Sequence, residues 1–119
     1  MSNINESLNS ALEIDGAQGV ALVDLKSGMA LGLAGHAPDL EIEAAGNTEI
    51  VRAKFKVLQS LGRKDSIEDV LITLGSRYHL LRIVGGSSGL MLYLNLNRAD
   101  ANLALARHKL AQIEGDLVV

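Results

Sequence analysis

The sequence predicts one α+β domain whose elements follow the order αββαβββα. Apolar residues recur at helical spacing in three segments, and five short apolar or alternating runs bounded by glycine and polar residues are typical of strands. A length of 119 residues, with 48% hydrophobic and 21% charged residues, suits a single globular domain with its own core. We therefore expect residues 1–119 to form one domain without a linker or a repeat.

The first predicted helix covers residues 3–14. Asn3 and Glu6 have the spacing of a capping box at its start. Gly16 suits the left-handed conformation in which many helices end. Because the helix is short, it has to pack on the rest of the domain to be stable.

A hairpin is predicted next, with strands at residues 18–25 and 29–33. The segment Lys-Ser-Gly joins them, and a three-residue hairpin turn commonly places glycine at positive φ. We expect Gly28 to take that position, because glycine adopts it without steric cost.

The longest predicted helix covers residues 39–60. Asp39 follows a proline and suits the N-cap position. The apolar arc of this helix is wider than one sheet contact needs. Gly46 costs about 1 kcal/mol relative to alanine inside a helix, which predicts either a close backbone approach or a later helix start.

Three strands and a helix complete the pattern. We predict strands at residues 66–74, 78–84 and 90–96. In the last of these, leucine alternates with Met, Tyr and Asn, so both faces are largely apolar and the strand is expected at the centre of the sheet. The final helix is predicted at residues 98–115 with Asn97 as its N-cap.

The glycine-serine run at residues 85–89 raises the question of a phosphate-binding loop. Such loops lie between a strand and a helix and carry a lysine followed by Ser or Thr. This run lies between two predicted strands, and the nearest basic residue before it is Arg82, inside a strand. We therefore interpret the run as a hairpin turn.

No pattern of catalytic or metal-binding residues stands out. The three histidines lie on a loop, a strand and a helix, without a second ligand at metal-binding spacing; they are His36, His79 and His108. No nucleophile elbow surrounds the serines of the glycine-serine run, Ser87 and Ser88. Helix capping explains the acidic group Asp39, Glu41 and Glu43 better than a cation site. We expect no catalytic residue, no metal and no cofactor, and hence a protein that is not an enzyme.

Composition argues against several classes of partner. A net charge of −3 and only three aromatic residues do not favour nucleic-acid binding. The N-terminal residues lack the pattern of a signal peptide, and no apolar run reaches the roughly 20 residues that span a bilayer. The sequence has no cysteine, which is compatible with the cytoplasmic location that we expect.

The residues also predict self-association. The strand at 66–74 contains an apolar stretch without Pro or Lys, and as a sheet edge it would need to be paired or covered. A two-fold dimer would cover this edge and the wide apolar arc of the long helix together. The alternative is that other parts of the same chain cover both. The residues expected in the dimer interface are Ala44, Val51, Phe55, Leu58, Ile67, Val70 and Ile72.

The element order and two segments resemble the Roadblock/LC7 superfamily. In "GVALVDLKSGMALG", a short apolar strand, the acidic Asp24 and the turn glycine Gly28 precede a second strand. The second segment is "IEDVLITLGSRYHLLRIV", followed by the leucine-rich strand "LMLYLNLN". The bacterial members that the chain resembles accompany small Ras-like GTPases, such as the GTPase-activating partner in gliding motility.

The resemblance implies a five-stranded antiparallel sheet with one long helix on one face and two helices on the other. It also implies a homodimer that binds a Ras-like small GTPase and modulates its GTP hydrolysis or signalling, without a catalytic arginine, so Arg52 and Arg82 are not expected to act as one. Two alternatives remain open. One is a dimeric scaffold of the dynein light-chain kind, without effect on GTP turnover. The other is a small-molecule sensory domain, with polar candidates at Tyr78, His79 and Tyr93.

Overall fold

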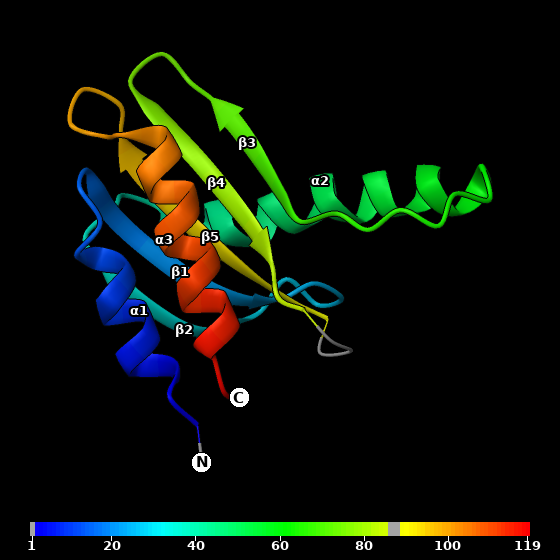
Figure 1. Cartoon of the computed structure of the whole chain (residues 1–119), viewed down its shortest axis with the longest axis horizontal. Helices are drawn as coiled ribbons and strands as arrows, with labels where there is room; N and C mark the ends of the chain where they lie inside the picture. The colour runs from blue at the N-terminus through cyan, green and yellow to red at the C-terminus, as the bar shows by residue number, and fades with distance from the viewer. Residues whose placement is uncertain (1, 86–88) are drawn as a thin grey trace.

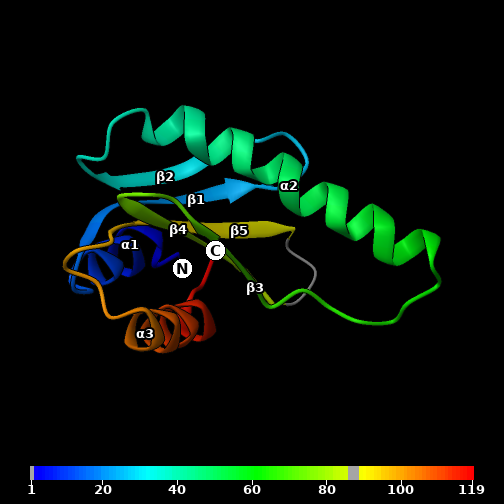
Figure 2. The same cartoon turned by 90° about the horizontal axis from the view of Figure 1, so that it is seen from above.

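A computed structural model describes residues 2–85 and 89–119. The sheet contains five antiparallel strands in the order β2-β1-β5-β4-β3. Two helices, α1 and α3, cover one face, and the long helix α2 covers the other (Figures 1 and 2). The sequence prediction of the fold class is confirmed. The elements are α1 (Ile4–Leu12), β1 (Ala17–Asp24), β2 (Ala30–Gly35), α2 (Leu40–Ser60), β3 (Asp69–Thr73), β4 (Arg77–Ile83), β5 (Leu90–Asn97) and α3 (Leu103–Asp116).

The core forms two layers on either side of β5. Residues 90–96 of this strand are all buried. Leu92 and Leu94 face the layer beneath α1 and α3, and Met91 and Tyr93 face the layer beneath α2. The central position predicted for this strand is therefore confirmed, because only a strand covered on both faces buries both sets of side chains.

Both turn glycines behave as predicted, but Gly46 does not. Gly28 has φ = 75° in the β1–β2 turn, and Gly16 has φ = 87° after α1. A Cβ atom at Gly46 would meet nothing within 4 Å, and α2 already begins at Leu40. Neither a close approach nor a late helix start explains Gly46 within this chain.

Of the three predicted N-cap residues, Asn3 and Asp39 stand at the N-cap position of their helices without a capping hydrogen bond, and Asn97 does not cap α3. The side chain of Asp39 makes no capping hydrogen bond, and its backbone is left-handed with φ = 54°. Asn97 still belongs to β5, where its N–H donates to the carbonyl of Gly16 at 2.7 Å. Asn102 caps α3 instead, accepting from the N–H of Leu105 at 3.1 Å, so this helix starts five residues later than predicted.

The third cap is replaced by a contact between the two ends of the chain. The side chain of Asn3 makes no capping bond to α1. Its Nδ2 donates to the carbonyl of Asp116 at 2.8 Å, and its Oδ1 accepts from the N–H of Val118 at 2.6 Å. These bonds join the start of α1 to the end of α3.

Two further sequence predictions concern strand ends. β3 covers Asp69–Thr73, which is shorter than the predicted strand at 66–74. The glycine-serine run joins the neighbouring antiparallel strands β4 and β5, as a turn requires. Residues 86–88, including Ser87 and Ser88, lie outside the described residues.

Within residues 2–85 and 89–119, no helix is both long and apolar enough to cross a membrane.

Candidate interaction surface

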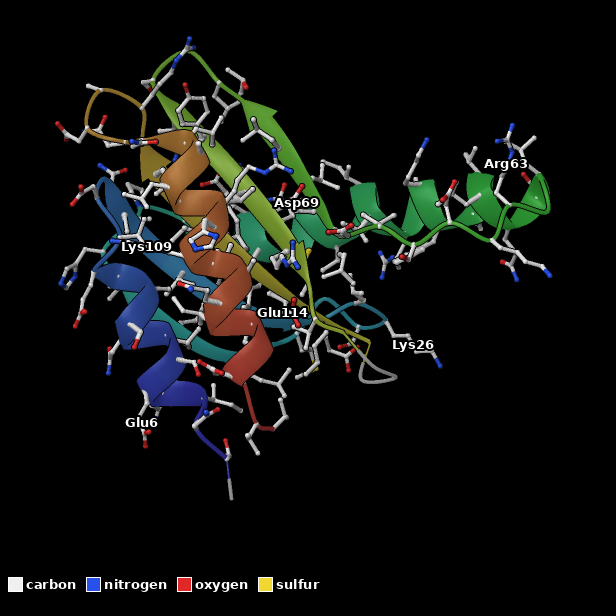
Figure 3. All side chains as sticks on the ribbon, in the orientation of Figure 1. Glu6, Lys26, Arg63, Asp69, Lys109 and Glu114 are labelled. Carbon is white, nitrogen blue, oxygen red and sulfur yellow. The ribbon has the colours of Figure 1, made fainter. Side chains whose placement is uncertain are left out.

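Only the first half of α2 lies on the sheet. Leu40, Ala44 and Val51 are buried against it, whereas residues 53–57 are all exposed. Figure 1 shows the second half of the helix projecting past β3, and Figure 3 places Arg63 at the far end of this projection. The second half of α2 therefore lacks much of the tertiary packing that normally stabilises a helix.

The helix leaves large apolar side chains in solvent. Five of them, on α2 and at its C-terminal end, keep 36–73% of their surface exposed: Ile42, Ile50, Phe55, Val57 and Leu61. Scattered apolar residues are common on protein surfaces, but a contiguous apolar patch marks an interaction site. We call residues 53–61 the projecting segment of α2.

Charge is separated along the same helix. The N-terminal half and its cap contain Asp39, Glu41, Glu43 and Glu49. From residue 52 to residue 64 the chain carries five basic residues and no acidic one. Because the whole chain has a net charge of −3, this basic end contrasts with the rest of the molecule. The acidic start agrees with the helix dipole, which favours acids in the first turn of a helix, and Glu41 and Glu43 lie there.

Arg52 fixes the point where the projection starts. Its Nη1 donates to the carbonyls of Leu25 and Lys26, at 3.0 and 2.7 Å. These two residues lie at the end of β1 and in the turn that follows it. The guanidinium group thus ties the middle of α2 to the β1–β2 turn.

β3 forms the sheet edge on the side of this projection. Within residues 2–85 and 89–119 it pairs with β4 alone, so no described strand covers its outer edge. Val70 and Ile72 pack towards the core beneath α2. Asp69 accepts two hydrogen bonds from Arg107 of α3, at 2.9 and 3.0 Å, which fixes the start of the strand (Figure 3).

The structure divides the seven residues predicted for the dimer interface. Ala44 and Val51 are fully buried against the sheet of their own chain, so they support α2 and cannot also face a second copy. Phe55 and Leu58 lie on the projecting segment. The remaining three, Ile67, Val70 and Ile72, are half-buried on or just before β3.

The residues predicted for the interface do not include three other exposed apolar residues of the same helix and its C-terminal end, Ile50, Val57 and Leu61. They belong to the wide apolar arc, but the sequence does not say which part of that arc the sheet covers. The missing information is how far the sheet extends beneath the helix.

A polar cluster lies between α2 and the sheet, close to the first half of the helix; His79, Tyr93 and Asn95 are buried in it, whereas Glu43 and Arg77 at its rim are half-buried. Glu43 Oε1 accepts from Arg77 Nη1 at 3.3 Å, and Glu43 Oε2 lies 3.6 Å from Nε2 of His79. The ring of His79 meets Tyr93 edge-on, with centroids 5.0 Å apart. Asn95 lies opposite His79 in the sheet and is fully buried.

Burial controls the protonation of this cluster. Desolvation lowers the pKa of His79, although the nearby Glu43 carboxylate opposes this shift, and Arg77 adds to it. Desolvation also raises the pKa of Tyr93 above its ordinary value. Near neutral pH we therefore treat both side chains as uncharged.

The structure brings together two of the three residues considered for a sensory site. His79 and Tyr93 belong to this polar cluster. Tyr78 packs towards the opposite layer, beneath Arg98, whose guanidinium carbon is 5.4 Å from the ring centroid. A cavity of about 730 Å³ opens beside the cluster and includes Glu43 and Arg77 in its wall, but neither His79 nor Tyr93 lines it.

The histidines do not form a metal site. His79 is buried, whereas His36 and His108 are exposed on a loop and on α3. No group of three or more His, Asp or Glu side chains within the described ranges is arranged to hold a metal ion. The projecting segment of α2 is both apolar and basic, which is typical of a contact site for another macromolecule.

Comparison with solved structures identifies the fold. A Roadblock/LC7 domain from Streptomyces avermitilis superposes with a TM-score of 0.81 at 16% identity, covering 96% of this chain and 93% of that one. MglB from Myxococcus xanthus gives 0.80 at 20% identity, covering 94% and 89%. The gliding protein MglB from Thermus thermophilus gives 0.68 at 20% identity, covering 94% and 88%.

Comparison of the sequence alone is less informative. No protein-family model matches the chain, and no curated protein matches it either. At identities of 16–20% the superpositions report the arrangement of the backbone. The chain therefore has the Roadblock/LC7 fold.

Proposed function

We propose that the chain is a non-catalytic homodimer that binds a Ras-like small GTPase and modulates its GTP hydrolysis or signalling. The observation that carries the proposal is the projecting segment of α2, where the large apolar side chains of Phe55, Val57 and Leu61 are exposed. The fold shared with Roadblock/LC7 domains and with MglB supports it. The link to a GTPase comes from the resemblance to bacterial GTPase-accessory members of that superfamily.

A second copy would complement this surface in charge. In a two-fold contact the same patch is used twice. If the two α2 helices run antiparallel, the acidic half of each faces the basic half of the other. The apolar side chains Phe55, Val57 and Leu61 then pack over the partner chain, and the two open β3 edges come within reach of each other.

The arginines agree with a non-catalytic role. Arg52 is held by two carbonyl groups of the β1–β2 turn. Arg82 is held by Glu114, with 3.1 Å between Nε and Oε1. An arginine that completes a GTPase active site has to reach the transferred phosphate, and both of these side chains are engaged inside their own chain.

The proposal is tested by nucleotide-dependent capture. The immobilised protein is exposed to lysate of its source organism with a non-hydrolysable GTP analogue or with GDP. We expect a small GTPase to be retained in only one of the two nucleotide states. Retention of no GTPase in either state would contradict the proposal.

The rate of GTP hydrolysis by the captured GTPase distinguishes a regulatory protein from a dimeric scaffold. Its rate of GTP turnover is measured with and without this protein at saturating concentration. We expect a changed rate. An unchanged rate with intact binding would favour the dimeric scaffold instead.

A further inference from the structure

The outer edge of β2 is unprotected against pairing with another strand. Within residues 2–85 and 89–119, β2 pairs with β1 alone and ends the sheet on the side opposite β3 (Figure 1). Natural sheet edges are commonly protected by charged side chains or by proline. From Ser27 to Ala37 the chain contains no Lys, Arg, Asp, Glu or Pro. The edge therefore lacks both of these protections.

Large apolar side chains lie beside this edge. Met29, Leu31 and Leu33 of the β1–β2 hairpin and Ile42 of α2 keep 43–73% of their surface exposed. Leu31 and Leu33 point to the α2 face of the sheet, because a Cβ atom on Gly32 between them would meet side chains of α1 on the other face. Met29 and Ile42 line one cavity of about 490 Å³. The edge thus has an apolar face, which is typical of an interaction site.

The backbone of β2 offers hydrogen-bonding groups to another strand. The N–H of His36 donates to the carbonyl of Gln18 on the β1 side at 2.9 Å. In an antiparallel ladder, bonds to one neighbour recur at every second residue, so the N–H and C=O groups of Leu33 point away from β1. Leu31 is the extra residue of a bulge, and within the described chain it has no partner residue in β1.

The sequence of this edge reads the same in both directions. Residues 30–34 are Ala-Leu-Gly-Leu-Ala, which is symmetric about Gly32. When two copies of β2 pair antiparallel about a two-fold axis through Gly32, Leu31 of each copy lies opposite Leu33 of the other. The four leucines then lie together on the α2 face of the joined sheet. An isologous contact requires such self-complementarity, and cross-strand apolar pairs stabilise a sheet.

The charges of the neighbouring helix α1 do not oppose this contact. Its acidic residues Glu6 and Glu13 line depressions shared with α3. The side chains of α1 that lie above Gly32 are Ile4 and Leu8. Two copies can therefore approach along β2 without bringing these carboxylates onto the edge.

We infer that β2 pairs with β2 of a second copy of this chain, antiparallel about Gly32. The contact lies at the opposite edge of the sheet from β3, so it does not rest on the proposed dimer or on GTPase binding. With six residues a side it belongs among weak interfaces, and we expect a Kd on the order of 1 mM. Where chains are also joined through α2, the second two-fold contact extends dimers into rows.

Disulfide trapping tests the register of the two strands. The chain has no cysteine, so Leu31→Cys and Leu33→Cys each introduce a single exposed thiol. The two variants are mixed in equal amounts, one of them ¹⁵N-labelled, and oxidised, and mass spectrometry counts mixed and like pairs. Opposite residues have Cα atoms about 5.5 Å apart, within disulfide reach, whereas like residues lie diagonally at about 7–8 Å. We expect mixed pairs to far exceed the half that random collision gives.

A control pair of variants sets the level of random collision. Leu105→Cys and Val118→Cys, at exposed positions on and after α3, should give mixed pairs in about half of the linked product. A mixed share for the β2 variants that is no greater than in this control would overturn the inference.

Amide resonances test the contact without cysteine. Phe55→Asp with Leu61→Asp removes exposed apolar residues of α2, so that association through β2 is observed alone. We expect resonances of residues 31–35 to shift as the ¹⁵N-labelled variant is concentrated from about 0.1 to 1 mM. Adding Leu31→Lys and Leu33→Lys should abolish these shifts, because charged side chains protect a sheet edge. Resonances of β2 that do not change with concentration, or shifts confined to β3, would contradict the inference whether or not the α2 dimer forms.

Discussion

At the scale of single residues, the side chains that matter most are those whose partners lie far away in the sequence. The sequence suggests a helix cap for Asn3 and no specific contact for Arg52. The structure shows Asn3 joined to residues 116 and 118, and Arg52 joined to residues 25 and 26. Local patterns identify a capping residue only by type, so they could not exclude these competing partners.

His79 should make stability depend on pH. Because burial lowers its pKa in the folded state, the unfolded chain binds a proton first as the pH falls through about 6.5. The contribution of neutral His79 to the free energy of unfolding is therefore present above that pH and lost below it. We expect the free energy of unfolding in urea to drop between pH 7.5 and 5.5.

His79→Gln isolates this effect from the titration of carboxylates. The glutamine variant should show a smaller drop over the same pH range, because it has no imidazole to protonate. His108→Gln, on the exposed face of α3, is the control and should keep the full drop. If the unfolding free energy of His79→Gln and of the wild type fell equally with pH, protonation of His79 would not be the cause of the drop.

Arg52→Met tests the tie between α2 and the β1–β2 turn. The variant loses two hydrogen bonds to backbone carbonyls but keeps an aliphatic side chain. We expect a loss of about 1 kcal/mol in unfolding free energy and faster amide exchange in the turn. Lys109→Met, on α3 at the other face of the sheet, should change neither quantity. No change in amide exchange for Arg52→Met would contradict this role.

At the scale of elements, strand and helix types were predictable but their ends and surroundings were not. In β5, leucine alternates with Met, Tyr and Asn because both faces of the strand are buried. The sequence was therefore enough to predict that this strand lies at the centre of the sheet. The start of α3 could not, because Asn97 and Asn102 are chemically equivalent caps and only sheet pairing assigns the former to β5. The overhang of α2 follows from length, since 21 residues make a helix of about 32 Å above five strands spaced by about 4.8 Å.

Gly46 provides a test on α2 itself. Its surroundings are open and its φ is not positive, so only the helix propensity of glycine remains. Gly46→Ala should stabilise the chain by about 1 kcal/mol, measured as a higher urea midpoint. Gly35→Ala should instead lower the urea midpoint. The φ of Gly35 is 93°, and a Cβ atom there would lie 2.5 Å from the carbonyl oxygen of Gln18. A lower midpoint for Gly46→Ala would mean that another chain approaches the helix there.

At the scale of the whole molecule, the two faces of the sheet have different roles. The α1–α3 face is held together by the terminal contacts and by the ion pairs of Asp69 and Glu114. The α2 face leaves half of its helix uncovered. The sequence indicated self-association from the apolar arc, but it could not separate the residues that support α2, Ala44 and Val51, from those that extend beyond the sheet.

The charge separation along α2 predicts how the dimer responds to substitution. Lys54→Glu with Lys56→Glu places acidic residues against the acidic half of the partner helix, and we expect the dimer dissociation constant to rise at least about tenfold, or 1.4 kcal/mol. Adding Glu41→Lys and Glu49→Lys should restore much of the affinity. Analytical ultracentrifugation across a concentration series measures both. Failure of the second pair to restore affinity would contradict antiparallel pairing of the helices.

The homodimer is tested most directly by the molar mass of the full chain in solution, measured by light scattering during size-exclusion chromatography at about 100 μM and moderate salt. The projecting segment of α2 and the open edge of β3 predict twice the 12.6 kDa of one chain, falling towards one chain for Phe55→Asp with Leu61→Asp. A wild-type mass of 12.6 kDa at that concentration would mean that a different partner, or none, covers this surface.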